Sequence, residues 1–369
     1  MALRRLSSGH RPDSFLLALI FILTIIGLVI LSSASSDLGK TRFDNSYYYL
    51  IHQLLYGLLL GAIGFITTYF IDYRRYRNLA LPFLLLSIIA LTLVFTRFGP
   101  VIRETHRWVV IGPISFQPAE LLKLTFIMYL SVWLSNTTMR RGSSIIEGYL
   151  PFLTVTGLVA ALLLMQPATS TVVILISSGL IVYFASGAKV KYIFITALIG
   201  LVCLAGVILA TPYRLARVKG YLAGGKDTQG ANYHLNQALI AIGSGGLKGV
   251  GYGQSTAKLR NLPEPIDDSV FAILAEEFGF IGSSIVMALF AMLTFRLFWL
   301  ARQTHDNFGK LMLIGFASVI ALQTIVHISA ISGLLPLTGV PLPLVSYGGT
   351  ALAVFLTMLG VTVNISRHT

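Results

Sequence analysis

Apolar runs long enough to cross a membrane recur along the whole chain, and they restrict the fold more than any other feature. A helix needs about 20 apolar residues to span a hydrocarbon core of roughly 30 Å. We predict ten such helices, at residues 15–33, 51–70, 79–95, 118–134, 149–165, 171–186, 191–210, 269–299, 311–333 and 349–365. The chain is therefore predicted to be an all-α polytopic membrane protein.

Composition supports this class and excludes others. The 369 residues are 55% hydrophobic and only 11% charged, whereas about a quarter of a soluble domain is charged. The net charge of +13 suits membrane orientation and anionic headgroups better than nucleic acid, so we expect no nucleic-acid partner. The single cysteine, Cys203, lies inside an apolar run, and no Cys/His motif suggests zinc or haem.

The basic residues predict how the chain is oriented. With the N-terminus in the cytoplasm, fourteen Lys and Arg fall on inner segments and five on short outer loops. Because positive residues concentrate on the cytoplasmic side, both termini are predicted to be cytoplasmic. We expect a single transmembrane domain over 1–369, with a cytoplasmic tail at 1–14, an uncleaved first span, and a long extracytoplasmic loop at 211–268 between the seventh and eighth spans.

Two further outer connections have unusual sequences. The segment 96–117 mixes Arg107 and Trp108 with the turn-forming pair Gly112–Pro113, so it is expected to fold back on itself or to dip into a protein-lined cavity. The segment 331–347 is apolar but rich in Pro and Gly. We expect it to pack within the bundle near the outer surface.

Two pairs of acidic residues bracket the start of the eighth span. Asp267 and Asp268 precede it, where a carboxylate serves either as a helix N-cap or as a general base for a hydroxyl at the membrane surface. Glu276 and Glu277 lie about two turns further on. Acids inside a span mark either a structural ion pair or a functional site, and the sequence leaves both alternatives open.

A third candidate is the pair Glu120 and Lys123 in the fourth span. Their i, i+3 spacing lets them form an internal ion pair. If Lys123 instead faces the outer cavity, it would hold a phosphate together with the other cations of that side. The glycines at 243–253 supply flexible backbone but lack the strand–helix context of a phosphate-binding loop.

At these residues the chain resembles the SEDS family (shape, elongation, division and sporulation) of membrane peptidoglycan glycosyltransferases. The resemblance rests on five segments: RWVVIGPISFQPAELLKL (107–124), YRLARV (213–218), ANYHLNQALIAIGSGGLKGVGYGQS (231–255), LPEPIDDSVFAILAEEFGFIG (262–282) and SGLLPLTGVPLPLVSYGGT (332–350). It extends from the first span to the last, and the family also has ten spans. Within the family, the second and third segments look more like the division-type FtsW than the elongation-type RodA.

The resemblance implies a function. It implies that lipid II, an undecaprenyl-pyrophosphoryl disaccharide-pentapeptide, is polymerised into glycan strands on the outer face of a bacterial cytoplasmic membrane. It also implies a class B penicillin-binding protein as partner, within the divisome or the elongasome. Two alternatives stay open: a lipid II flippase, and a weakly active scaffold that activates a partner transpeptidase. The sequence identifies no certain cofactor and leaves a divalent cation, Mg²⁺ or Mn²⁺, open.

The resemblance also assigns residues. Asp268 takes the place of the family's catalytic aspartate, with Asp267, Glu264, Glu276 and Glu277 as supporting acids. The expected substrate-binding residues are Arg107, Glu120, Lys123, Gln237, Ser244, Lys258 and Ser346. Two departures stand out: Ile266–Asp267 replaces the family's His-Thr, and Ala168 replaces an acidic cavity residue.

Overall fold

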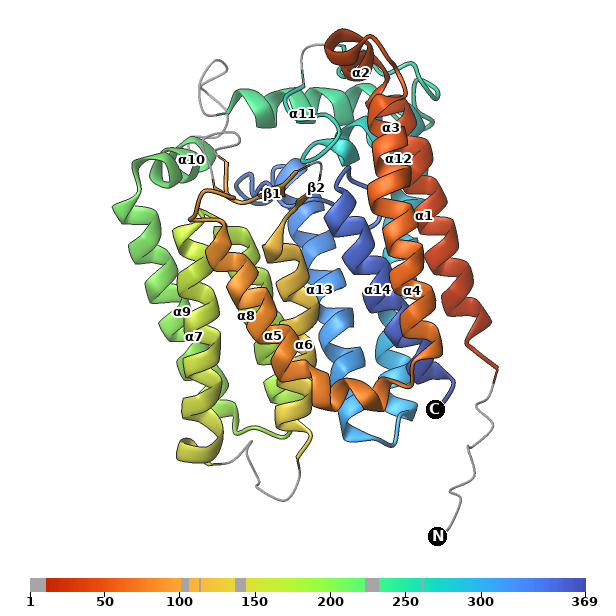
Figure 1. The fold of residues 1–369 in the computed structure, drawn as a ribbon. Helices are drawn as coiled ribbons and strands as arrows, with labels where there is room; N and C mark the ends of the chain where they lie inside the picture. Colours follow the sequence, from red (N-terminus) through yellow and green to blue (C-terminus); the bar gives the residue numbers. More distant parts are fainter. Residues whose placement is uncertain (1–10, 101–105, 113, 137–143, 223–231, 260–261) are drawn as a thin grey trace.

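A bundle of helices runs in roughly one direction through the molecule in the computed structural model (Figure 1). The structure describes residues 11–100, 106–112, 114–136, 144–222, 232–259 and 262–369. All ten predicted spans are helical there. They are α1 (Ser14–Ala34), α3 to α4 (Tyr48–His52 and Leu60–Phe70, joined by the π-helical turn Gln53–Leu59), α5 (Tyr76–Leu93, after the 3₁₀ turn Tyr73–Arg75), α6 (Pro118–Leu134), α7 (Leu150–Met165, after the π-helical turn Ile145–Tyr149), α8 (Thr169–Ala185), α9 (Val190–Ala210), α12 (Val270–Gln303), α13 (Asn307–Ile331) and α14 (Gly349–Ser366).

Eight helices among the described residues are long and apolar enough to cross a membrane. The other two predicted spans, α6 and α8, are 17 residues long each. They pack against each other and against α13. The all-helical membrane class is thus confirmed, and the count of ten spans depends on these two shorter helices.

The helices at the centre of the bundle differ from those at its edge. In the most apolar 18-residue stretch of each helix, most residues of α13 and of α14 are buried, but only 6% of the residues of α9 are buried. Phe194 and Leu201 on α9 are largely exposed. In water such surface would be unfavourable, but against lipid tails it costs nothing. Central helices surrounded by apolar outward-facing ones are the arrangement expected of a membrane protein.

The two ends of the bundle are different. At one end, called here the termini end, α1 begins and α14 ends (Figure 1). The backbone N–H of Asp13 donates to Ser366 Oγ at 3.3 Å, and the Asp13 carboxylate pairs with Arg296 at 2.5 Å. The start of α1 and the end of α14 therefore lie on one side of the bundle, as the predicted topology requires. Most of the predicted tail, and the basic pair Arg140–Arg141, lie outside the described residues.

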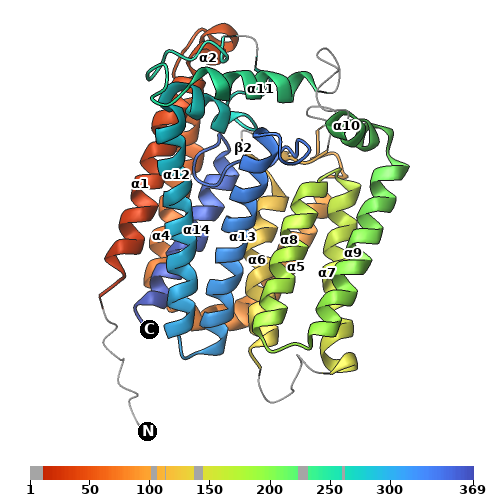
Figure 2. The same ribbon diagram turned by 180° about the vertical axis from the view of Figure 1, so that it is seen from behind.

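The opposite end, called here the loop end, contains short helices and a β-hairpin, which are elements that the sequence did not predict. The segment 96–117 does fold back on itself, as a β-hairpin of β1 (Val109–Ile111) and β2 (Ile114–Phe116) with Val109 opposite Phe116. The long loop contains two helices, α10 (Pro212–Leu222) and α11 (Tyr233–Ser244). These lie across the end of the bundle, together with the short helix α2 (Ser36–Phe43) (Figures 1 and 2).

The long helix α12 is broken near its start. Gly279 has φ 66° and ψ −167°, which is not helical. The glycine-rich segment 245–251 fits into this break: the N–H of Val250 donates to the Glu276 carbonyl at 2.9 Å. A Cβ on Gly279 would lie 2.3 Å from the Gly249 nitrogen. The glycines are therefore needed for close contact between two backbones, which supplies the hydrogen bonds that the broken helix cannot make.

Candidate functional site

Asp268 lies at the loop end, immediately before α12. The helix N-cap is Ser269, so of the two alternatives that the sequence left open for Asp267 and Asp268, the N-cap position is taken by the next residue. The N–H of Ser269 donates to the Glu264 carbonyl at 3.1 Å, which closes the segment 264–269 into a turn. Glu264 takes a positive φ of 47° in this turn. Asp268 therefore lies one residue before the N-cap, beside the positive end of the α12 dipole.

The two neighbouring aspartates face different parts of the protein. A Cβ built on Gly339 would lie 3.2 Å from Asp268 Oδ2, so this carboxylate lies against the backbone of the 332–348 loop. The carbonyl of Asp267 accepts a hydrogen bond from Ser346 Oγ at 2.7 Å. Burial, and then the charge of Asp267, raise the pKa of the Tyr347 phenol. Asp267 therefore lies toward Ser346 and Tyr347, and Asp268 toward Gly339.

The 332–348 loop packs within the bundle as predicted, with Val340, Leu342 and Val345 almost fully buried. A buried segment rich in proline lacks backbone donors, so its carbonyls must be satisfied from elsewhere. Side chains from three helices supply them. Five side chains donate to loop carbonyls at 2.6 to 3.2 Å: Tyr221 to that of Leu334, Arg217 to that of Leu337, Ser170 to that of Thr338, His327 to that of Val340 and Gln323 to that of Pro341.

Beneath this loop lies the predicted pair Glu120 and Lys123. Lys123 Nζ is 2.7 Å from Glu120 Oε1, which confirms that the two residues pair internally. The same ammonium donates to Gln323 Oε1 at 2.7 Å, and Gln323 in turn holds the Pro341 carbonyl. Lys123 is 1% exposed. In this structure it supports the loop from below, and its predicted contact with substrate remains a prediction.

Arg107 lies near the end of α7. Its guanidinium donates to the Gln166 carbonyl at 3.2 Å and to the Pro167 carbonyl at 2.5 Å. These carbonyls directly precede Ala168, where the family resemblance would place an acid. Arg107 is partly exposed, so of the predicted cations it is better placed than Lys123 to meet a ligand from outside.

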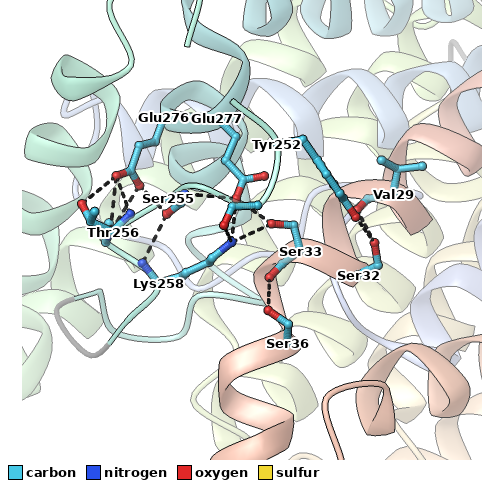
Figure 3. A network of polar contacts seen from close by, with 12 residues as sticks. Val29, Ser32, Ser33, Ser36, Tyr252, Ser255, Thr256, Lys258, Glu276 and Glu277 are labelled. Atoms are coloured by element: carbon cyan, nitrogen blue, oxygen red, sulfur yellow. Dashed lines mark hydrogen bonds and ion pairs between the residues drawn. The ribbon is translucent and has the colours of Figure 1, made fainter. Parts of the chain in front are cut away.

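Glu276 and Glu277 are both structural in this geometry (Figure 3). Glu276 accepts from Ser255 Oγ, and from the N–H of Thr256 at 2.9 Å. Glu277 Oε1 is 2.8 Å from Lys258 Nζ and 2.5 Å from Ser33 Oγ on α1. Of the two alternatives left open by the sequence, the structure supports a structural role for both: a buried ion pair for Glu277, and hydrogen bonds from hydroxyl and backbone N–H groups for Glu276.

Lys258 has all three of its ammonium protons engaged within the protein. Its acceptors are Glu277 Oε1, Ser33 Oγ and the Gly253 carbonyl, each at 2.8 Å. The side chain is 5% exposed. The structure thus uses Lys258 to fasten the glycine-rich segment to α1 and α12, and gives no support to a substrate contact.

The remaining predicted residues are on α11 and in the 332–348 loop. Ser244 is exposed, and its hydroxyl donates back to the Ala241 carbonyl at 2.8 Å. Gln237 lies two turns earlier and is partly exposed. Ser346 is buried and holds Asp267, so it acts on the site through the backbone. Substrate binding by Gln237 and Ser244 stays a prediction.

Sequence reasoning missed His234, which contacts the residue after Asp268. Its Nε2 is 2.6 Å from Ser269 Oγ, and that hydroxyl donates to the Pro263 carbonyl at 2.8 Å. Since Ser269 has only one proton to give, Nε2 carries the hydrogen in this contact. Burial, and then the positive charge of Arg217, lower the pKa of His234 to about 4. The residue is therefore neutral at physiological pH and ties α11 to the 264–269 turn.

Among the described residues, no group of three or more His, Cys, Asp or Glu side chains could hold a metal ion. A divalent cation bound by such a group is therefore not supported in the described part of the chain.

Comparison with known proteins identifies the relatives of this chain. Residues 13–369 match the family model of FtsW, RodA and SpoVE, described as cell cycle protein. The chain is 34% identical over 361 residues to stage V sporulation protein E of Bacillus subtilis, covering 97% of each chain. It is 32% identical over 357 residues to the probable peptidoglycan glycosyltransferase FtsW of Geobacter sp. (strain M18), covering 96% of this chain and 97% of that one.

Solved structures share the fold. A chain from a peptidoglycan synthase complex, studied for its structural coordination of polymerization and crosslinking, has a TM-score of 0.77 at 28% identity. The alignment covers 97% of this chain and 98% of that one. The rod shape determining protein RodA of Thermus thermophilus has a TM-score of 0.72 at 29% identity, with 96% and 97% covered.

The buried ion pair between Glu277 and Lys258 predicts strong coupling between the two residues. Glu277→Gln leaves an ammonium buried without its counter-charge, which costs about 3–5 kcal/mol of stability. Lys258→Met in the same chain recovers a large part of that loss, because the unpaired charge is removed. Thermal unfolding in detergent of both single variants and the double variant measures the coupling.

A surface pair provides the control for this cycle. Arg77 pairs with Asp306 at 2.5 Å, but the Arg77 side chain is 45% exposed. Arg77→Met should therefore change stability by less than about 1 kcal/mol. If the effects of the two changes in the Glu277–Lys258 pair simply add, the ion pair does not hold the segment as described.

His234 predicts a dependence of stability on pH. Its pKa is about 4 in the folded protein and about 6.5 when unfolded. The unfolded state binds more protons between these values, so stability falls as the pH drops from 6.5 toward 4 and is constant above that window. His234→Gln removes this titration, and its amide nitrogen occupies the place of Nε2. The midpoint of thermal unfolding at about pH 7.5 and 5 should thus fall less in the variant; an equal fall in both proteins would contradict the assignment.

Proposed function

Since the chain belongs to the FtsW, RodA and SpoVE family of cell cycle proteins, we propose that it is a SEDS peptidoglycan glycosyltransferase that polymerises lipid II. Relatives that carry the name peptidoglycan glycosyltransferase match it along almost their whole length. The multi-pass helical fold agrees with that of the solved RodA chain. The similarity to FtsW proteins favours a role in division and septal wall synthesis.

The observation that carries this proposal is the position of Asp268. Its carboxylate lies at the loop end, beside the α12 N-terminus and against the glycine backbone at position 339. In the proposed reaction the hydroxyl of one lipid-linked sugar attacks the anomeric carbon of another. Asp268 accepts the hydroxyl proton as the new bond forms. The bond to pyrophosphate breaks, and undecaprenyl pyrophosphate leaves with the electron pair.

The leaving pyrophosphate needs positive charge, and Arg107 is the first candidate. It is partly exposed, while Lys123 is buried with Glu120 and Gln323. A guanidinium makes strong charge-assisted hydrogen bonds to phosphate oxygens. Its present acceptors are two backbone carbonyls near the loop end, which a doubly charged phosphate group would outcompete.

We place the loop end on the extracytoplasmic face of a bacterial cytoplasmic membrane. The distribution of basic residues supports this, because fourteen fall on the predicted inner segments and five on the predicted short outer loops. Lipid II would reach Asp268 from the outer leaflet. The partner that we propose is a class B penicillin-binding protein, since a solved relative belongs to a synthase complex of polymerization and crosslinking.

A flippase would need a polar route through the bundle. In the described spans, Asp, Glu, Lys and Arg lie close to one end or the other: Glu120 and Lys123 in the first two turns of α6, and Arg296 near the end of α12. The clustering of polar groups at the loop end favours chemistry on that face over transport through the bundle.

Replacing Asp268 tests the proposed base. Asp268→Asn keeps the shape of the side chain and removes the proton acceptor, so we expect polymerisation to fall by about 10²- to 10⁴-fold. Asp267→Asn is the matched control, because Asp267 is held through its backbone carbonyl, and it should keep most of the activity. The assay uses purified protein, alone and with a class B penicillin-binding protein, on labelled lipid II.

The outcomes separate the alternatives. Glycan polymer from the wild type and none from Asp268→Asn supports the enzyme. A wild type that makes no polymer even with its partner contradicts the proposal and favours transport or a scaffold role. Equal loss in both aspartate variants would contradict the division of roles between them.

A further inference from the structure

Two side chains of α13 hold the backbone of the 332–348 loop at adjacent residues. His327 Nδ1 is 2.6 Å from the Val340 carbonyl, and Gln323 Nε2 is 2.8 Å from the Pro341 carbonyl. The two donors are four residues apart, so they lie on one face of the helix. They fix two consecutive peptide units of a segment that has no regular secondary structure.

The chemistry of His327 in this position is fixed. A carbonyl oxygen only accepts hydrogen bonds, so Nδ1 carries the proton. Within the described residues Nε2 is buried with no hydrogen-bond partner, which favours the neutral ring, in which Nε2 carries a lone pair and no proton. The ring is 2% exposed. The buried imidazole therefore makes one hydrogen bond among the described residues, to the Val340 carbonyl.

That contact is next to Asp268. Gly339 directly precedes Val340, and a Cβ on it would lie 3.2 Å from Asp268 Oδ2. Gly339 adopts a positive φ of 64°, so its peptide planes are fixed in an orientation that few other residues allow. The bond from His327 therefore fixes the orientation of the Val340–Pro341 peptide unit, which begins one residue after the glycine that lies against the carboxylate.

We propose that His327 is a positioning residue, which holds the Gly339–Val340 backbone so that the Asp268 carboxylate is kept in its reactive position. The inference rests on the proposed function of Asp268. It extends the site to a residue deep in α13 that does not touch the substrate.

Magnitudes separate this role from a purely structural one. The loop is already held by buried Val340, Leu342 and Val345 and by four other side-chain donors. One more hydrogen bond contributes only a small part of the stability of such a loop. A shift of about 1 Å in a reacting group, however, is able to lower a rate by about 100-fold. Loss of the bond should therefore affect turnover far more than folding.

Two substitutions at one position test the proposal. In His327→Asn the amide nitrogen stands as many bonds from Cβ as Nδ1 does, so the donor to Val340 is kept while the rest of the ring is removed. In His327→Leu the donor is lost. We expect kcat for lipid II polymerisation to fall by about 10- to 100-fold in the Leu variant with KM changed less than about threefold, and to stay within about threefold of wild type in the Asn variant.

Thermal unfolding in detergent confirms that both variants are folded. If the Leu variant does not fold, His327→Gln replaces it, since its donor stands one bond too far along the side chain. Equal kcat in the Leu and wild-type proteins, or equal loss in the Leu and Asn variants, overturns the role of His327 while the proposed function stands. A wild type without polymerase activity overturns both.

Discussion

Irregular backbone buried in a membrane-spanning bundle must find all its hydrogen bonds within the protein. This constraint explains most of the loop end. The break in α12 at Gly279 receives the glycine-rich segment, whose amides donate to the Glu276 and Glu277 carbonyls. The proline-rich 332–348 loop receives donors from α8, α10 and α13. Asp268 lies against the second of these segments, at Gly339, so its position depends on how that loop is held.

The same segments show how the buried charges are used. Glu277 and Lys258 fasten the glycine-rich segment, and Glu120 and Lys123 support the 332–348 loop through Gln323. Each ammonium has a carboxylate partner, as burial requires. Asp268 and Arg107, by contrast, are partly exposed at the loop end. We infer that the buried pairs build the site and that the partly exposed groups carry out its chemistry.

The sequence was a good guide where the information is local. Hydropathy located the ten predicted helices, and the turn pair Gly112–Pro113 indicated that the segment 96–117 folds back, although Pro113 itself lies outside the described residues and the β-hairpin was not predicted. The break at Gly279 was not predictable, because its cause is the approach of Gly249 from a distant segment. The role of Glu276 and Glu277 stayed open for the same reason: their partners come from 255–258 and from α1. His327 was missed among scattered histidines, although an ionisable residue one turn from Gln323 inside an apolar span was a usable signal.

The 332–348 loop sets the position of Asp268 through the contact at Gly339. A pair of glycine substitutions tests this dependence most directly. Gly339 and Gly333 both have positive φ, 64° and 77°, so alanine strains the backbone at either by about 1–2 kcal/mol. Only at Gly339 does the new Cβ reach Asp268, at 3.2 Å; at Gly333 it meets Leu239 at 3.6 Å. The measurement is the rate of lipid II polymerisation. We predict that Gly339→Ala loses about tenfold or more while Gly333→Ala stays close to wild type. Equal rates in the two variants would contradict the claim.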